Sequence, residues 1–128
     1  MKKKYLYHAT FMECLESIRE NGLGGVKEKN WKISKEGVVC FSSSAARAEH
    51  YALLAKDQNP KRWRSIITVL AVRADLLREE DMEKDGCDPL TVEYRGVVPP
   101  SRLYVFHFTD GRHERLRRPE AEARKKRA

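Results

Sequence analysis

The stretch SIITVLAV, residues 65–72, is the longest run of apolar and β-branched residues in the chain. β-branched side chains pack well on a pleated sheet, and an apolar run without polar alternation is typical of a strand covered on both faces. We therefore expect this stretch to form the central strand. Shorter patterns outside it also predict strands: KYLYH at 4–8, GVVCFS at 37–42, LTVEY at 90–94 and RLYVFHFT at 102–109.

Helical patterns separate these strands. Thr10 and Glu13 have the spacing of a capping box, in which a hydroxyl and a carboxylate satisfy exposed backbone N–H groups. Gly22 suits the left-handed conformation of a helix end. These signals predict a helix over residues 11–21. Serine caps followed by good helix formers predict a second helix over residues 43–56.

A third helix is expected over residues 74–84, beginning near Asp75, and the glycine- and lysine-rich residues 24–36 are typical of a loop. Short helices thus alternate irregularly with strands, and the last strands are close in sequence. This order predicts an α+β fold with mainly antiparallel pairing and short flanking helices, rather than a doubly wound parallel sheet.

Length and composition favour a single intracellular domain. The 128 residues suffice for one hydrophobic core, and 41% of them are hydrophobic while 35% are charged. No apolar run approaches the roughly 20 residues that cross a bilayer, and the initial MKKK is not followed by the apolar region of a secretory signal. We expect a cytoplasmic protein without membrane contact.

The net charge of +7 is concentrated at the two ends of the chain. Residues 112–128 hold eight Lys or Arg against three Glu, and residues 2–4 are three lysines, which leaves residues 5–111 at −1. We expect a folded domain over residues 1–111 and a basic, flexible tail over 112–128. Such ends can contact the phosphates of a nucleic acid or an acidic partner.

The three cysteines, Cys14, Cys40 and Cys87, are odd in number and share no C-x-x-C spacing with one another or with a histidine. The pattern predicts neither a disulfide framework nor a zinc site. We expect free thiols and no metal ion.

Four blocks of the sequence, in a fixed order, carry a resemblance to a known enzyme class. They span about residues 5–108 and read LYHAT with LESIRENGL, VVCFSSSAARAEHYA, ITVLAVRADLL and TVEYRGVVPPSRL. These blocks resemble ADP-ribosyltransferases of the diphtheria-toxin and poly(ADP-ribose) polymerase type, the class named for a His, Tyr, Glu triad. The resemblance implies an ADP-ribosyltransferase-like split β-sheet core and NAD as a substrate. The absence of a G-x-G-x-x-G or P-loop motif fits an enzyme that consumes NAD instead of using it for hydride transfer.

The resemblance implies that Glu93 is the catalytic residue. Cleavage of the bond between nicotinamide and ribose creates an oxocarbenium-like sugar, which a nearby carboxylate stabilises. From the residues alone, the favoured interpretation of Glu93 is an outward-facing glutamate of an alternating strand. Tyr51 matches the helix tyrosine that stacks on the cationic nicotinamide ring, a contact of about 1 kcal/mol. A tyrosine on an amphipathic helix is also typical of core packing.

By the same resemblance, His8 hydrogen-bonds a ribose hydroxyl of NAD, and the backbone of Ala9 holds the carboxamide. Enzymes of this class usually have glycine at the position of Ala9, and alanine adds only a methyl group. Thr10, Phe41 and Ser42 complete the implied NAD-binding set. A helix cap is the structural alternative for Thr10, and strand termination is the alternative for the other two.

Two positions depart from the family pattern. Cys40 stands where a tyrosine is common, so weaker NAD binding is expected. An aromatic sandwich around nicotinamide would then be one-sided, or completed by Trp31, Phe41 or Trp63. Thr91 lies two residues before the implied catalytic glutamate, where arginine-modifying relatives carry an acidic or amide residue, so an arginine target is not indicated.

The sequence therefore predicts a mono-ADP-ribosyltransferase that transfers ADP-ribose to a protein or nucleic acid, as an intracellular effector or toxin. An NAD-dependent RNA 2'-phosphotransferase is a second hypothesis, because that enzyme shares a similar start and a VPP turn like that at residues 98–100. It is disfavoured by the lack of an N-terminal module rich in Arg and His. A third hypothesis is a catalytically inactive module that binds a nucleotide, a nucleic acid or a partner protein, and Cys40 favours it.

Overall fold

A computed structural model describes residues 4–24, 38–84 and 91–116. Its strands are β1 (Tyr5–Phe11), β2 (Val39–Ser42), β3 (Ile67–Arg73), β4 (Met82–Lys84), β5 (Thr91–Tyr94), β6 (Leu103–His107) and β7 (Arg112–Arg115). Its α-helices are α1 (Leu15–Asn21) and α2 (Ala45–Gln58). Its 3-10 turns are η1 (Met12–Cys14), η2 (Pro60–Arg62), η3 (Ala74–Leu76), η4 (Glu79–Asp81) and η5 (Pro100–Arg102).

The strands form one sheet in the order β4-β5-β2-β1-β3-β6-β7, and each described pair of neighbours is antiparallel. The prediction of an α+β fold with mainly antiparallel pairing and short helices is confirmed. β3 occupies the interior of the sheet, as the SIITVLAV stretch predicts, because its residues Leu70, Ala71 and Val72 are fully buried.

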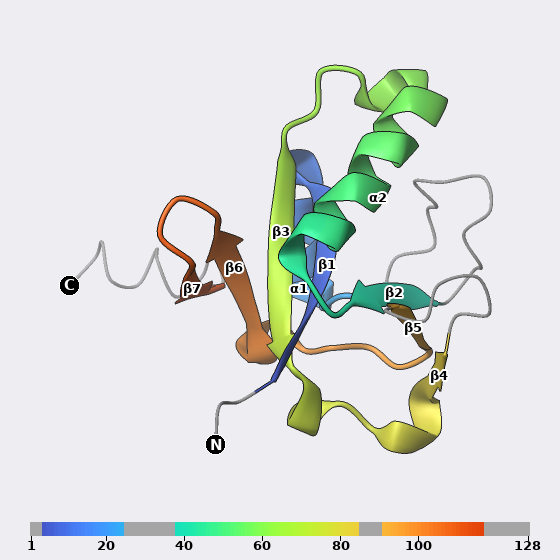
Figure 1. Ribbon diagram of the computed structural model, residues 1–128, viewed down its shortest axis with the longest axis vertical. Helices are drawn as coiled ribbons and strands as arrows, with labels where there is room; N and C mark the ends of the chain where they lie inside the picture. The colour runs from blue at the N-terminus through green and yellow to red at the C-terminus, as the bar shows by residue number, and fades with distance from the viewer. Residues whose placement is uncertain (1–3, 25–37, 85–90, 117–128) are drawn as a thin grey trace.

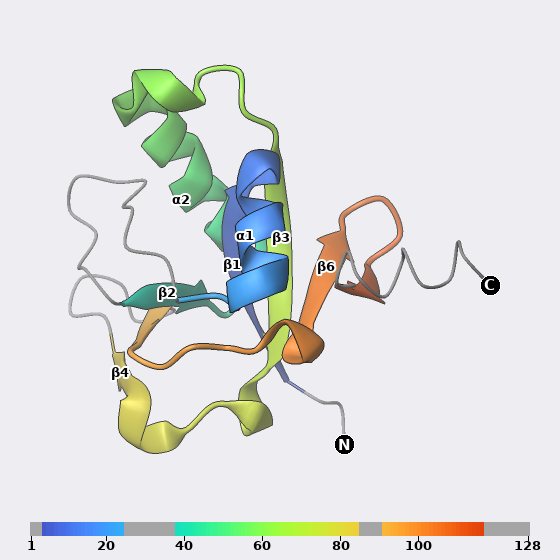
Figure 2. The ribbon, with the colours of Figure 1, turned by 180° about the vertical axis from the view of Figure 1, so that it is seen from behind.

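The two helices cover opposite faces of this sheet, as Figures 1 and 2 show from front and back. Leu15 and Ile18 of α1 belong to the larger core cluster, which includes Leu6, Leu70 and Leu103. The smaller cluster on the other face joins Ala45 and Ala48 of α2 to Val69, with Tyr7, Ala9 and Phe106 packed against it. Alternation along each strand therefore sends one set of side chains toward α1 and the next toward α2.

The sheet divides into two parts between β1 and β2. β1 pairs with β3 through seven residue pairs, from Tyr5 opposite Arg73 to Phe11 opposite Ile67. In the described register, β1 and β2 share the single pair Tyr7 and Ser42. Figure 1 shows β2 running crosswise to β1 and β3, so the two strands separate on either side of this pair.

The predicted start of the first helix is wrong. Thr10 lies within β1 and is buried, and the turn that follows has no side-chain cap. Glu13 instead accepts hydrogen bonds from Arg62 at 2.8 Å and from Ser65. The end of the helix is as predicted, since Gly22 has φ +84°, and a Cβ there would lie 2.6 Å from the Val98 carbonyl oxygen.

The helix predicted over residues 74–84 is also wrong. This segment forms η3, η4 and the short strand β4, in which Met82 lies opposite Tyr94 of β5. The Tyr94 hydroxyl accepts a hydrogen bond from the Arg78 amide at 3.4 Å, and the Arg95 amide donates to the Asp81 carbonyl at 2.9 Å. Pairing with β5 thus overrides the helix-forming composition of the segment.

The sheet continues past the domain boundary expected at residue 111. Residues 112–115 form β7, which pairs with β6, and the following Leu116 is buried in the larger core. The Leu116 amide donates to the Leu103 carbonyl at 3.0 Å. The folded domain therefore extends at least to Leu116, while residues 117–128 of the predicted tail lie outside the described residues. No helix in the described part of the chain is long and apolar enough to cross a membrane.

Candidate active site at the division of the sheet

His8 and Glu93 are both neighbours of Cys40, from two different strands. His8 Nδ1 lies 2.9 Å from the backbone carbonyl oxygen of Cys40. Glu93 lies directly opposite Cys40 in the β2–β5 register. The three residues are 32 and 53 positions apart in sequence and come together only because β2 is placed between β1 and β5. Cys40 adjoins the place where β1 and β2 separate.

The hydrogen bond to Cys40 determines which nitrogen of His8 carries a proton. A carbonyl oxygen can only accept, so Nδ1 donates, and Nε2 of the neutral ring keeps a lone pair. Burial lowers the pKa of His8, and the bond to the Cys40 carbonyl opposes that shift more weakly. The neutral ring is favoured at pH 7, with Nε2 able to accept a hydrogen bond from a ligand hydroxyl.

Glu93 is almost buried, with 9% of its surface exposed, and it has a second acidic residue beside it. Glu83 of β4 lies opposite Glu93 across the strand pair, while its own carboxylate is 3.6 Å from the guanidinium of Arg95. The sequence did not predict this neighbour, because Glu83 was expected to lie in a helix over residues 74–84. A strand of three residues is too short to show the alternation of polar and apolar residues that identifies a strand. The site thus presents two carboxylates, one buried and one exposed and paired with an arginine.

Phe41 and Ser42 support this site from within the fold. Phe41 is fully buried and contacts the His8 ring edge-on, with ring centroids 6.1 Å apart. Ser42 is buried as well, and its Oγ lies 3.4 Å from Oγ1 of Thr91. The two residues fix the end of β2 and the orientation of His8, and their side chains expose almost no surface to a ligand.

Ala9 and Thr10 follow His8 along β1. Ala9 lies opposite Val69 and packs with the small cluster beneath α2. Thr10 is buried opposite Thr68. Since the described pairing of β1 with β2 is at Tyr7, Ala9 and Thr10 lie beyond it along β1.

The aromatic residues considered for stacking are spread more widely. Tyr51 is half-buried on α2, one turn after Ala48, which packs on the sheet. Trp63 is exposed and lines a groove with Leu53, Lys56 and Asp57 at the far end of α2. Trp31 and Cys87 lie outside the described residues.

Among the described residues, no group of three or more His, Cys, Asp or Glu side chains could hold a metal ion. Neither a scan against models of protein families nor a search of curated proteins found a match to the chain. Function is therefore argued from the site itself.

Proposed function

We propose that the protein is a mono-ADP-ribosyltransferase that cleaves NAD and transfers its ADP-ribose group to a macromolecule. The observation that carries the proposal is that His8 and Glu93 are both neighbours of Cys40 where the sheet divides: His8 binds the Cys40 backbone carbonyl, and Glu93 lies opposite Cys40 in the β2–β5 register. Support also comes from the separation of β1 and β2, which fits the split sheet that the sequence resemblance implies.

The chemistry of the two side chains suits the reaction. The Nε2 lone pair of neutral His8 can accept a hydrogen bond from a ribose hydroxyl and so orient the dinucleotide. The bond between ribose C1' and nicotinamide breaks, and nicotinamide leaves with the electron pair. The nearly buried carboxylate of Glu93 stabilises the positive charge that develops on the sugar. The acceptor then forms a bond to C1' and releases a proton.

Nicotinamide release from NAD tests this proposal. We expect the wild type to release nicotinamide and Glu93→Gln to be at least about 100-fold slower, because glutamine keeps the shape of glutamate but not its charge. Glu80→Gln, an exposed glutamate of η4, is the matched control and should retain the wild-type rate. Binding of labelled NAD to each variant, measured in parallel, separates lost turnover from lost binding.

Three outcomes would contradict the proposal. Absence of nicotinamide release by the wild type, with labelled NAD still bound, would favour a binding module. Equal rates for the wild type and Glu93→Gln would remove Glu93 from the reaction. Release that requires an RNA with an internal 2'-phosphate would identify the phosphotransferase instead.

A further inference from the structure

An unbroken row of residues crosses six strands on the face of the sheet that carries α2. Each residue in the row lies opposite the next in the antiparallel register: Thr91, Ser42, Tyr7, Ala71, Tyr104 and Arg115. Residues opposite one another share a face of the sheet, so the row leads from the Glu93 strand to the last strand, β7. Tyr7 lies in the middle of the row, where the two parts of the sheet meet.

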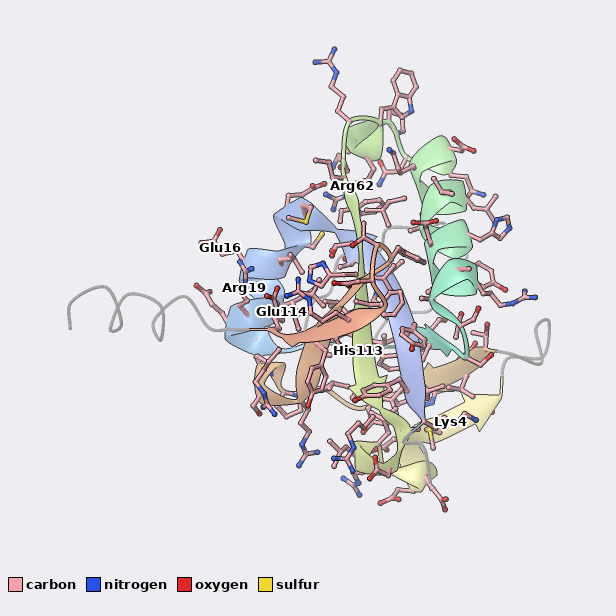
Figure 3. All side chains as sticks on the ribbon, turned by 60° about the vertical axis from the view of Figure 1, so that its left-hand side comes forward. Lys4, Glu16, Arg19, Arg62, His113 and Glu114 are labelled. Carbon is pink, nitrogen blue, oxygen red and sulfur yellow. The ribbon has the colours of Figure 1, made fainter. Side chains whose placement is uncertain are left out.

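Partly exposed aromatic rings surround the β7 end of this row. His113 stacks on Tyr5 at 4.2 Å between ring centroids, and its Nε2 lies 3.3 Å from the Tyr7 hydroxyl. Tyr104 meets Tyr5 edge-on, and Phe106 contacts both Tyr7 and His113. Figure 3 shows His113 on the side of β7 toward β1, whereas its neighbour Glu114 lies on the side of α1. These rings form one continuous aromatic surface.

Phe108 extends the aromatic surface beyond the end of β6. It is 50% exposed, and its ring meets that of Phe106 edge-on at 5.0 Å. A large apolar ring that is half exposed beside other aromatic residues is costly in water and suggests a partner with flat apolar faces.

Cationic side chains lie at the rim of the aromatic surface. The Arg115 guanidinium lies 5.4 Å from the Tyr104 ring centre and donates to the Ser101 carbonyl and the Tyr104 hydroxyl. None of the described contacts of Arg115 is to a carboxylate. Arg112, exposed at the start of β7, lies 3.8 Å from the Asp110 carboxylate and 4.0 Å from that of Glu114, and Lys4 is exposed beside Tyr5. The arrangement places the positive charge of Arg115 against the flat ring of Tyr104.

The basic ends of the chain leave the fold close to this surface. Leu6 lies opposite Val72, which lies opposite Leu103, and Leu103 binds the Leu116 amide. The beginning of β1 and the end of β7 are therefore at the same end of the sheet. The sequences beyond them are basic, with lysines at positions 2 and 3 and six Lys or Arg against two Glu in residues 117–128.

We propose that this face, formed by Tyr5, Tyr7, Tyr104, Phe106, Phe108 and His113 with Arg112 and Arg115 at its rim, binds single-stranded nucleic acid. Unpaired bases supply flat faces that stack on aromatic rings, and the phosphates complement the arginines. In a duplex, the base faces are occupied by neighbouring pairs, so stacking of this kind requires a single strand. Stacking on base faces and attraction of phosphates do not depend on the identity of the base, so the binding tolerates different nucleotide sequences.

The row of opposed residues also relates this surface to the site in space. A strand on the aromatic surface lies on the same face as Thr91, and Glu93 follows two residues later on that face. Thr91, Ser42 and Ala71 of the row are buried, so the row places the aromatic surface and Glu93 on one face without forming an exposed path between them. Binding itself does not depend on NAD cleavage.

Fluorescence anisotropy of a labelled single strand of about 12 nucleotides, as RNA and as DNA, tests the binding. At about 50 mM salt we expect the wild type to bind both, and Arg112→Glu/Arg115→Glu to bind at least tenfold more weakly with a shallower salt dependence. Arg64→Glu/Lys61→Glu, which places the same charge change in the segment between α2 and β3, is the matched control and should bind within about twofold of the wild type.

A second variant tests the stacking apart from the charge. Phe108→Leu keeps an apolar side chain but removes the ring, and we expect about fivefold weaker binding at both low and high salt. Circular dichroism of each variant verifies that the fold is retained.

Binding that is equal in all variants would place the contact at the basic ends of the chain and overturn the proposal. Binding of the annealed duplex as tight as that of the single strand would also overturn it, because charge alone would then suffice. Absence of binding by the wild type would do the same and would leave open a protein partner for this face. Nicotinamide release measured without nucleic acid keeps these outcomes distinct from a failure of the proposed enzyme activity.

Discussion

The two strands next to β1, β3 and β2, pair with it over different lengths. β3 pairs with β1 over seven residue pairs, and Leu70 in this half is fully buried. β2 shares the single described pair between Tyr7 and Ser42, and the His8 ring bridges the separation to the Cys40 carbonyl. One side of β1 is thus paired along the whole strand, and on the other side the pairing ends where His8 binds the Cys40 carbonyl. Substitutions on the two sides should therefore change different properties.

The largest effect is expected on the paired side. Leu70→Ala should lower the free energy of unfolding by about 3 kcal/mol, because it removes buried methyl groups and leaves a cavity in the larger core. Urea denaturation measures the change. Ile66→Ala, at a 68% exposed position just before β3, should change it by less than about 0.5 kcal/mol. Similar losses for both variants would show that β3 is not the stabilising strand.

A smaller effect is expected for a substitution of His8, on the side of β1 that faces β2. His8→Ala removes the acceptor for a ribose hydroxyl and should weaken NAD binding about tenfold. It should cost less unfolding free energy than Leu70→Ala. Calorimetric titration with NAD measures the affinity, and His50→Ala, an exposed histidine of α2, is the control. Unchanged affinity in His8→Ala would separate His8 from the site.

At Cys40, a substitution is expected to strengthen NAD binding rather than weaken it. The cysteine side chain is exposed, so a tyrosine there should be tolerated by the fold. Cys40→Tyr should tighten NAD binding about fivefold by adding an aromatic face for the nicotinamide ring. Cys40→Ser adds no ring and should leave the affinity unchanged. A weaker rather than tighter complex with Cys40→Tyr would argue against a nicotinamide ring at this position.

The smallest effect is expected in the dependence of stability on pH. Burial lowers the pKa of His8 in the folded state, so the unfolded state binds a proton first as the pH falls. Stability should be at its full value above the ordinary histidine pKa of about 6.5 and should decrease as the pH falls below it. Burial also lowers the pKa of His113, so this residue adds to the loss of stability as the pH falls. Thermal unfolding of His8→Gln/His113→Gln should show a flatter profile between about pH 7 and pH 5.5 than the wild type.

Several elements could be predicted because their signals are local. An apolar β-branched run indicated β3, helix formers after a serine indicated α2, and Gly22 indicated the end of α1. The Ser44 side chain does accept a hydrogen bond from the Arg47 amide at the start of α2. For the site, the residue types of His8 and Glu93 were recognisable, but their shared neighbour Cys40 was seen only as a departure from a pattern.

Other elements could not be predicted, since distant contacts decide them. Residues 82–84 have a helical composition and form a strand because β5 offers an open edge. Residues 112–115 carry mostly charge and still extend the sheet, because β6 supplies backbone partners and Leu116 reaches the core. Backbone hydrogen bonding across a sheet depends little on side-chain type, so composition gives it a weak signal.

By itself, the sequence determined which segments are apolar enough to be buried, the α+β order of the chain, and the chemistry of the single residues His8 and Glu93. Only the tertiary structure decided that the sheet divides beside Tyr7, that both residues are neighbours of Cys40, and that aromatic rings from β1, β6 and β7 gather on one face. The physical reason is that burial and local conformation follow from neighbouring residues. Strand order and register arise instead from the simultaneous pairing of segments many residues apart.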